Sequence, residues 1–299
     1  MRVISLLPAA TEIVAAIGAG DRLVGVSHEC DHPAFVRRLP RVTRSAIDAS
    51  ARAGDIDAAV RERSAAGAPL FELDAERLHA LAPELLVTQA LCEVCAVAET
   101  DVRAIAATLP LAPAVVTING TTLAGVFDDV RRVGAALGRV EDAERRVQAL
   151  ERRVRTVHER LRAARAPRPR VAVIEWTDPV YTAGHWTPEL VRRAGGADVL
   201  ASAGEHSRRV APTEIAAAAP EVLVIAPCGF DLARAADDAR RLLASPEWAW
   251  ARDVPVWALD GNALLSRPGP RLVDALEVLA AMLHPALFGT ADRTVALRL

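Results

Sequence analysis

Short runs of apolar residues alternate along the chain with longer stretches in which apolar positions recur every three or four residues. In the first half, the short runs lie at residues 3–6, 23–26, 85–88 and 115–118. Such runs are typical of buried strands, and the periodicity between them is typical of helices. The alternation predicts an α/β fold with a parallel sheet.

One sequence pattern occurs twice. Residues 82–87 read Ala-Pro-Glu-Leu-Leu-Val, and residues 219–224 read Ala-Pro-Glu-Val-Leu-Val. A further apolar run follows each copy and ends in a turn pair, Asn119-Gly120 in the first half and Asp260-Gly261 in the second. We therefore expect two similar α/β halves, with a ligand-binding cleft between them.

Residues 140–165 are strongly charged and carry apolar side chains at steps of three and four. These side chains are Val147, Leu150, Val154, Val157 and Leu161. They predict one amphipathic helix of about 25 residues, roughly 38 Å long. It is either an ordinary surface helix or a rigid strut between two lobes. The predicted division is an N-terminal lobe at 1–138, a connecting helix at 139–167 and a C-terminal lobe at 168–299.

Composition excludes several classes of protein. The 299 residues are 52% hydrophobic and 25% charged, which is typical of a globular protein. The formal net charge of -2 gives no reason to expect nucleic acid as a partner. Lysine is absent from the sequence, which excludes mechanisms that need a Schiff-base lysine or a P-loop lysine.

The N-terminal segment shows no long apolar core followed by a small-residue cleavage site, and the sequence has no run of roughly 18 apolar residues. The chain as written is therefore expected to be cytoplasmic and not membrane-spanning, and periplasmic only if its N-terminus has been trimmed. Sequence motifs of hydrolases and nucleotide-binding enzymes are also missing. Binding without turnover is favoured over catalysis.

Chemically distinctive side chains follow the predicted strands, at the edge where open parallel sheets bind their ligands. In the first half these are Pro8, Thr11, His28, Cys30, Gln89, Cys92, Cys95 and Asn119. In the second half they are Trp176, Tyr181, His185, Trp186, Asp260 and Arg267. We expect these residues to form the binding site.

Large rings are concentrated in one turn-rich segment. Trp176, Tyr181 and Trp186 are suited to stacking on a planar or bulky ligand, and anchoring of the loop is the alternative. His185 is able to ligate a metal, although a single loop histidine more often has a structural hydrogen bond.

The cysteines give a sharper signal. Cys92 and Cys95 have the Cys-x-x-Cys spacing that is used in redox and metal sites. Cys30 and His28 follow a neighbouring strand, so these four side chains are candidate ligands for zinc or an iron–sulfur cluster. Alternatively, the cysteines are reduced and pack as small hydrophobic side chains, while His28 and Cys30 shape a turn.

Several segments resemble a known family. Residues 4–13 read Ile-Ser-Leu-Leu-Pro-Ala-Ala-Thr-Glu-Ile, residues 20–25 read Gly-Asp-Arg-Leu-Val-Gly, and residues 267–272 read Arg-Pro-Gly-Pro-Arg-Leu. They resemble the class III substrate-binding proteins of ABC transporters, which include vitamin B12 and iron-siderophore receptors. The resemblance covers most of the chain. Residues 28–31, 91–96 and 175–186 resemble a subgroup described as cobalamin-binding.

This resemblance implies two Rossmann-like lobes with parallel sheets, joined by a single long α-helix. It also implies a small-molecule ligand, namely cobalamin or another corrinoid. An ABC permease is the partner that the resemblance implies, although the sequence shows no export signal that would support this partner. In this hypothesis the three aromatic side chains stack on the ligand, and the cysteines and histidines coordinate or flank its metal. The rival hypothesis is a cytosolic metalloprotein that uses zinc or an iron–sulfur cluster in a redox or modification reaction.

Overall fold

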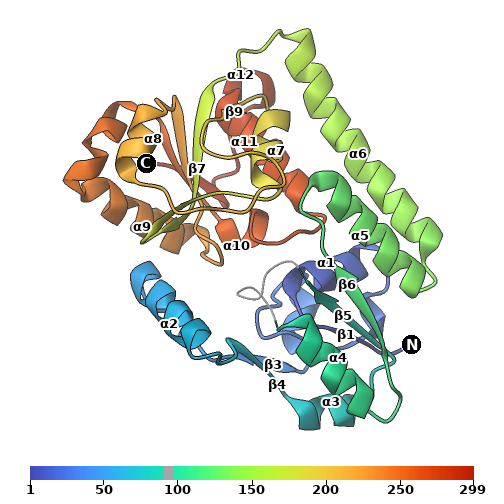
Figure 1. The fold of residues 1–299 in the computed structure, drawn as a ribbon. Coiled ribbons are helices and arrows are strands. Elements are labelled where there is room, and N and C mark those ends of the chain that lie inside the picture. Colours follow the sequence, from blue (N-terminus) through green and yellow to red (C-terminus); the bar gives the residue numbers. More distant parts are fainter. Residues whose placement is uncertain (91–96) are drawn as a thin grey trace. The chain divides into compact units, whose positions relative to one another are not determined.

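The computed structural model describes residues 1–90 and 97–299 (Figure 1). The chain forms two compact units, of which unit 1 comprises residues 1–120 and 124–149, and unit 2 comprises residues 121–123 and 150–299. Helix α6 (Val140–Ala163) begins in unit 1 and ends in unit 2. The predicted α/β class with two sheet-containing lobes and one long connecting helix is confirmed. The residue boundaries given above for the lobes stay a prediction.

Unit 1 is built on a four-stranded parallel sheet with the strand order β2-β1-β5-β6. The four strands are those predicted: β1 (Val3–Ser5), β2 (Leu23–Val26), β5 (Leu85–Gln89) and β6 (Ala114–Ile118). The α-helices are α1 (Pro8–Ala16), α2 (Ala53–Ala65), α3 (Ala75–Leu81), α4 (Glu99–Thr108) and most of α5 (Leu123–Ala136), with 3-10 helices at Gly20–Arg22 and Ala34–Arg38. Helix α2 connects β3 (Thr43–Ser45) to β4 (Phe71–Leu73), and these two strands pair antiparallel.

Unit 2 contains a second sheet, with the strand order β12-β11-β10-β7-β8 and with β9 beside β7. Its strands are β7 (Arg170–Thr177), β8 (Val180–Thr182), β9 (Ala197–Asp198), β10 (Val222–Ile225), β11 (Val256–Leu259) and β12 (Ala296–Arg298). Its further helices are α7 (Thr187–Arg193), α8 (Pro212–Ala217), α9 (Leu232–Ala244), α10 (Gly261–Leu264), α11 (Leu272–Leu283) and α12 (Pro285–Phe288), with a 3-10 helix at Pro246–Asp253. Strand β8 pairs antiparallel with β7, and β12 pairs antiparallel with β11, whereas β7, β10 and β11 are parallel. This sheet is therefore mixed, with a parallel centre.

The repeated Ala-Pro-Glu pattern has the same structure in both units. The alanine of each copy has a left-handed backbone conformation, with φ of 41° and 44°. In unit 1, Arg2 donates its backbone N–H to Glu84 Oε2 at 2.6 Å. In unit 2, Arg170 donates its backbone N–H to Glu221 Oε2 at 2.8 Å. Each glutamate thus fastens the beginning of the first strand of its sheet, and the sequence repeat is a structural repeat.

Helix α6 buries the predicted apolar stripe, and its 24 residues span about 36 Å at 1.5 Å per residue. The buried side chains are Val147, Leu150, Val154, Val157 and Leu161. Within unit 2, Arg153 donates to Glu277 at 2.8 and 2.6 Å and to Asp274 at 2.5 Å. These charge-assisted hydrogen bonds attach the second half of α6 to α11.

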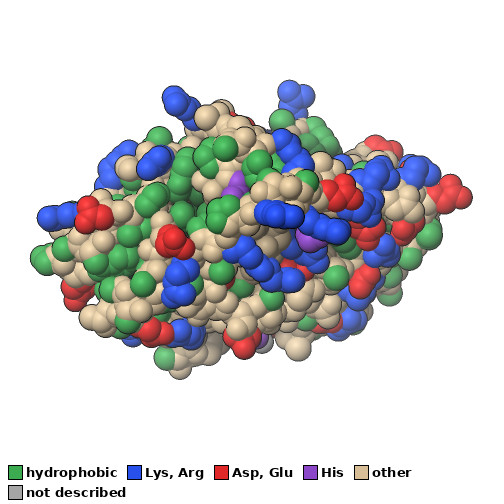
Figure 2. Space-filling view, turned by 90° about the horizontal axis from the view of Figure 1, so that it is seen from above, with side chains coloured by type: hydrophobic (Ala, Val, Ile, Leu, Met, Phe, Trp, Pro, Cys, Tyr) green, Lys and Arg blue, Asp and Glu red, His purple; other side chains and the backbone are tan. Residues whose placement is uncertain are grey.

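Charged side chains are scattered over one face of the molecule. On the face seen in Figure 2, arginine and acidic side chains are intermixed, in keeping with the net charge of -2. Within the described residues, no helix combines the length and the apolarity that crossing a membrane requires.

Asp198, at the end of β9, carries a buried carboxylate oxygen. Its Oδ1 accepts the backbone N–H groups of Leu200 at 2.9 Å and Ala201 at 3.0 Å, whereas its Oδ2 has no hydrogen-bond partner among the described atoms. Burial raises the pKa of Asp198 from 3.8 to about 6. The folded state therefore holds this proton more tightly than the unfolded state does. The contribution of Asp198 to the free energy of unfolding should rise as pH falls from 7 towards 4.

We expect the substitution Asp198→Asn to remove this pH dependence, because it keeps the Oδ1 acceptor and removes the charge. The ionised carboxylate costs the wild type at most about 3 kcal/mol, so the variant should gain stability relative to the wild type at pH 8 and not at pH 4. Urea unfolding at both pH values measures this difference. The exposed Asp253→Asn is the control, and an equal pH dependence in wild type and Asp198→Asn would contradict the assignment.

Candidate functional site

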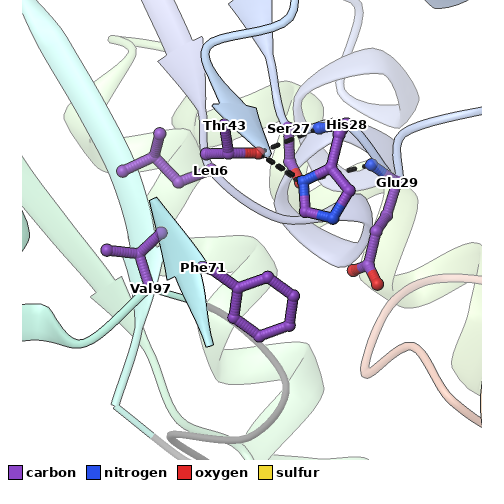
Figure 3. Close-up of a pocket in the computed structure, with 7 residues that line it drawn as sticks. All are labelled: Leu6, Ser27, His28, Glu29, Thr43, Phe71 and Val97. Carbon is purple, nitrogen blue, oxygen red and sulfur yellow. Dashed lines mark hydrogen bonds between the residues drawn. The ribbon is translucent and has the colours of Figure 1, made fainter. Parts of the chain in front are cut away.

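A small hollow lies at the carboxyl ends of β1 and β2 in unit 1 (Figure 3). Its empty space, which is open to solvent, amounts to 170 Å³. The lining residues are Leu6, Ser27, His28, Glu29, Thr43, Phe71 and Val97. Three of them are apolar and four are polar, so the hollow combines an apolar wall with hydrogen-bonding groups.

The hydroxyl group of Thr43 in β3 holds the imidazole of His28. The backbone N–H of His28 donates to Thr43 Oγ1 at 2.9 Å, and His28 Nδ1 lies 2.6 Å from the same oxygen. Thr43 Oγ1 donates to Ser27 Oγ at 3.2 Å. Phe71 of β4 lies beside the imidazole, with 5.6 Å between the ring centroids. These contacts fix the position of the ring (Figure 3).

The same contacts accommodate one tautomer of the imidazole in particular. A hydroxyl group offers one hydrogen and two lone pairs. With the hydrogen of Thr43 directed to Ser27, one lone pair accepts the backbone N–H of His28 and the second faces His28 Nδ1 at 2.6 Å. In the tautomer that carries its proton on Nδ1, Nε2 has the electron pair that binds metals. In Figure 3, Nε2 points away from Thr43 towards the hollow.

Two effects keep this imidazole neutral at pH 7. Partial burial lowers the pKa of His28, and the positive charge of Arg41 lowers that pKa further. The Arg41 guanidinium is held nearby because its Nη1 donates to the carbonyl oxygens of Ser27 at 3.0 Å and Cys30 at 2.7 Å. A neutral, oriented imidazole is the form of histidine that ligates a metal centre.

Cys30 is buried and contacts α1. Its Sγ lies 3.1 Å from Thr11 Oγ1, and Thr11 donates to Ser5 Oγ at 2.8 Å. Among the described residues, groups of three or more histidine, cysteine, aspartate and glutamate side chains that could hold a metal ion do not occur. Cys92 and Cys95 lie outside the described residues. The four-ligand set of Cys30, His28 and these two cysteines thus stays a prediction.

The other candidates of unit 1 lie at the same edge of the sheet. Pro8 begins α1 directly after β1, Gln89 is the last residue of β5, and Asn119 follows β6. Pro8 and Gln89 are buried, whereas Asn119 is exposed. This common position is the one at which open parallel sheets bind ligands. Contact between these three residues and a ligand stays a prediction.

In unit 2, Trp176 and Tyr181 face each other across a hairpin. Trp176 lies within β7 and is the register partner of Tyr181 in β8, so neither residue is in an irregular loop. The Trp176 ring meets Phe230 edge-on at 5.4 Å, and its Nε1 donates to the carbonyl of Asp178 at 3.0 Å. Trp176 and Phe230 together form a ring pair next to the turn.

Trp186 has a different environment from Trp176. It is 7% exposed, and its Nε1 donates to the carbonyl oxygen of Leu265 at 2.8 Å. This packing favours anchoring of the loop over stacking on a ligand. Asp260 caps α10 by accepting the N–H of Ala263 at 2.7 Å, and the buried Arg267 donates to Asn262 at 2.7 Å.

Three residues that shape these regions were not among the candidates: Thr43, Phe71 and His206. Thr43 and Phe71 belong to two three-residue strands that carry no motif. His206 lies 3.1 Å from His185, between Nδ1 of one ring and Nε2 of the other. The sequence offered one signal for His206: it is a second histidine, besides His185, in a turn-rich part of the second half.

The sequence model of the periplasmic binding protein family matches residues 3–251 of the chain. This chain belongs to the periplasmic binding protein family. The resemblance to class III substrate-binding proteins is confirmed by this match and by the relatives.

Relatives of this periplasmic binding protein extend over nearly its whole length. The vitamin B12-binding protein of Vibrio cholerae serotype O1 is 23% identical over 286 residues, which are 95% of this chain and 90% of that protein. A periplasmic heme-binding protein from Pseudomonas aeruginosa has a TM-score of 0.75 at 23% identity and covers 98% of this chain and 96% of its own. The periplasmic heme-binding protein RhuT from Roseiflexus sp. RS-1, in its apo form, has a TM-score of 0.68 at 26% identity. The match covers 96% of this chain and 98% of the RhuT chain.

The prediction of a cytoplasmic protein is wrong. The family that matches is that of the periplasmic binding proteins, and the similar solved structures are described as periplasmic. These findings point to the periplasm. The prediction relied on the absence of a recognisable export segment and of a long apolar run in the sequence, and these features do not determine where a member of this family works.

The family establishes a coarse function for this periplasmic binding protein. It is a substrate-binding protein of class III, a class that binds small ligands and works with ABC permeases. The rival hypothesis of a cytosolic zinc or iron–sulfur protein receives no support from the relatives.

Proposed function

We propose that this periplasmic binding protein binds a corrinoid, without turnover, and that His28 ligates the central metal of the ligand through Nε2. The observation that carries this proposal is the neutral imidazole that Thr43 orients towards the hollow in Figure 3. A corrin ring presents its metal at an axial position, and imidazole is a common axial ligand of metals in tetrapyrrole-type rings.

The size of the hollow agrees with a partial contact of this kind. Pockets that enclose a drug-sized ligand are typically about 300 to 1,000 Å³. The 170 Å³ of space beside His28 includes open solvent, so the hollow does not enclose a corrin ring and offers contact to only a part of one.

Glu29 is suited to the periphery of a corrinoid. Its carboxylate lines the same hollow. The periphery of a corrinoid carries amides whose N–H groups a carboxylate accepts. The apolar side chains of Leu6, Phe71 and Val97 are suited to the ring itself.

A spectrophotometric titration of the full chain tests the proposal with three probes. Aquocyanocobinamide has an axial water that imidazole can replace, cyanocobalamin has both axial positions filled, and hemin is the competing macrocycle. We expect cobinamide to bind with a shift of its visible spectrum and at least about tenfold more tightly than cyanocobalamin or hemin, a difference of about 1.4 kcal/mol. Tighter binding of hemin would contradict the choice of a corrinoid. Failure of all three probes to bind would contradict the proposed function.

A further inference from the structure

Two histidines of unit 2 direct ring nitrogens at each other. His185 Nε2 lies 3.1 Å from His206 Nδ1, the ring centroids are 4.9 Å apart, and the ring planes are nearly perpendicular at 88°. His185 precedes α7, and His206 lies in the irregular segment before α8. The two residues are 21 positions apart in sequence, so their contact depends on how these two segments are held.

Backbone hydrogen bonds hold the two segments together. His185 donates its N–H to the carbonyl of Glu205 at 2.6 Å, and Gly204 donates its N–H to the carbonyl of His185 at 2.8 Å. At the other end of the pair, Thr182 donates its N–H to the carbonyl of Arg208 at 2.9 Å. The imidazoles therefore project from a paired backbone.

The packing at Gly184 shows how tightly these segments are joined. A Cβ atom at Gly184 would lie 2.3 Å from the backbone nitrogen of Ser207, so only glycine allows the approach. His185 itself has a φ of 54°, which is uncommon for a residue other than glycine. Such a conformation persists where the surroundings impose it, and it is frequent at functional sites.

The distance between the two nitrogens is that of two ligands on one metal ion. Zinc–nitrogen bonds are about 2.0 to 2.1 Å long, which places two ligand nitrogens about 3.3 to 3.4 Å apart at tetrahedral angles and about 2.8 to 3.0 Å apart at right angles. The observed 3.1 Å lies between these values. We propose that His185 Nε2 and His206 Nδ1 form a two-nitrogen site for a divalent transition-metal ion such as Zn²⁺, Ni²⁺ or Cu²⁺, the ions that imidazole ligands suit.

The proton balance of this site is simple. Without metal, one of the two facing nitrogens carries a hydrogen and donates it to the other. When the metal binds, that hydrogen moves to the far nitrogen of the same ring, so the two rings together keep the same number of protons. The proposed site consists of these two nitrogens, since the described residues contain no group of three histidine, cysteine, aspartate or glutamate side chains able to hold the ion.

Calorimetric titration of the full chain with Zn²⁺ alone tests the site. The variants are His185→Asn, chosen because asparagine tolerates the left-handed backbone conformation, and His206→Gln. His158→Gln, at an exposed position of α6, is the matched control. We expect each of the first two variants to bind one equivalent of zinc at least about tenfold more weakly than the wild type, a change of about 1.4 kcal/mol, and the control to bind as the wild type does. Thermal unfolding confirms that each variant is folded.

Nitrogen-15 NMR of the imidazoles supplies an independent readout. Zinc should convert one ring from one tautomer to the other in the wild type and in His158→Gln. Wild-type zinc affinity in His185→Asn or His206→Gln would overturn the proposal, and so would an equal loss of affinity in the control. Because the titration contains no corrinoid, its outcome is separate from that of the proposed function.

Discussion

Replacing His28 by alanine is expected to weaken the binding of aquocyanocobinamide by more than about 100-fold and to abolish the shift of its visible spectrum. Loss of a hydrogen-bond partner of a metal ligand typically costs about 10- to 100-fold in affinity, and loss of the ligand itself should cost more. Cyanocobalamin, whose axial positions are filled, should bind the variant about as well as it binds the wild type. The preference for cobinamide should therefore vanish, which parallel titrations with the two probes measure.

Thr43 allows the same interaction to be weakened without removing the imidazole. Thr43→Val keeps the shape of the side chain and removes the oxygen that His28 Nδ1 contacts at 2.6 Å. We expect a loss of about 10- to 100-fold in cobinamide affinity, and Thr43→Ser should restore most of it. Nitrogen-15 NMR of the ligand-free variants should show the proton of the His28 imidazole on Nδ1 in the serine variant. In the valine variant this proton should be shared between Nδ1 and Nε2. Unchanged affinity in both His28→Ala and Thr43→Val would mean that the imidazole does not ligate the metal.

Sequence patterns predicted the parts of the fold that are repeated and apolar. Strands β1, β2 and β5 of the first sheet have fully or mostly buried side chains, so their apolar runs are continuous and easy to detect. The stripe from Val147 to Leu161 likewise has the helical period that a buried face requires. The pairing of β3 with β4 could not be predicted, because each strand has three residues and α2 separates them. Short strands of this kind are fixed by tertiary contacts and not by local pattern.

The candidate site was predictable to the extent that topology determines it. His28 and Cys30 were identified because they follow a strand of a parallel sheet, where ligand sites occur. Thr43 was not identified, since its role depends on three contacts made by one oxygen and sequence spacing does not encode them. Trp186 was identified as a candidate, but its environment was not predicted. Its neighbours in the sequence are typical of a turn, whereas in the structure it is buried and donates a hydrogen bond to Leu265, 79 residues away.

The substitution Gly261→Ala should destabilise the protein by about 3 kcal/mol, at the upper end of the range for overpacking. Gly261 begins α10 after β11, and a Cβ atom there would lie 2.2 Å from the carbonyl oxygen of Pro227. That oxygen belongs to the backbone that follows β10, so it cannot move aside as the end of a side chain can. For a unit of roughly 150 residues the expected decrease in Tm is about 6 to 12 °C.

Gly120, at the corresponding position after β6, should behave in the same way, since its Cβ would lie 2.5 Å from backbone atoms of Gly125 and Val126. Gly20→Ala is the matched control: its nearest neighbour is the ring end of the exposed Phe35 side chain at 2.8 Å, which can rotate away. The control should change the free energy of unfolding by less than about 1 kcal/mol. Urea unfolding distinguishes the cases. A Gly261→Ala protein as stable as Gly20→Ala would show that the turns after β10 and β11 can separate, and the carboxyl edge of the second sheet would then be less rigid than its hydrogen bonds indicate.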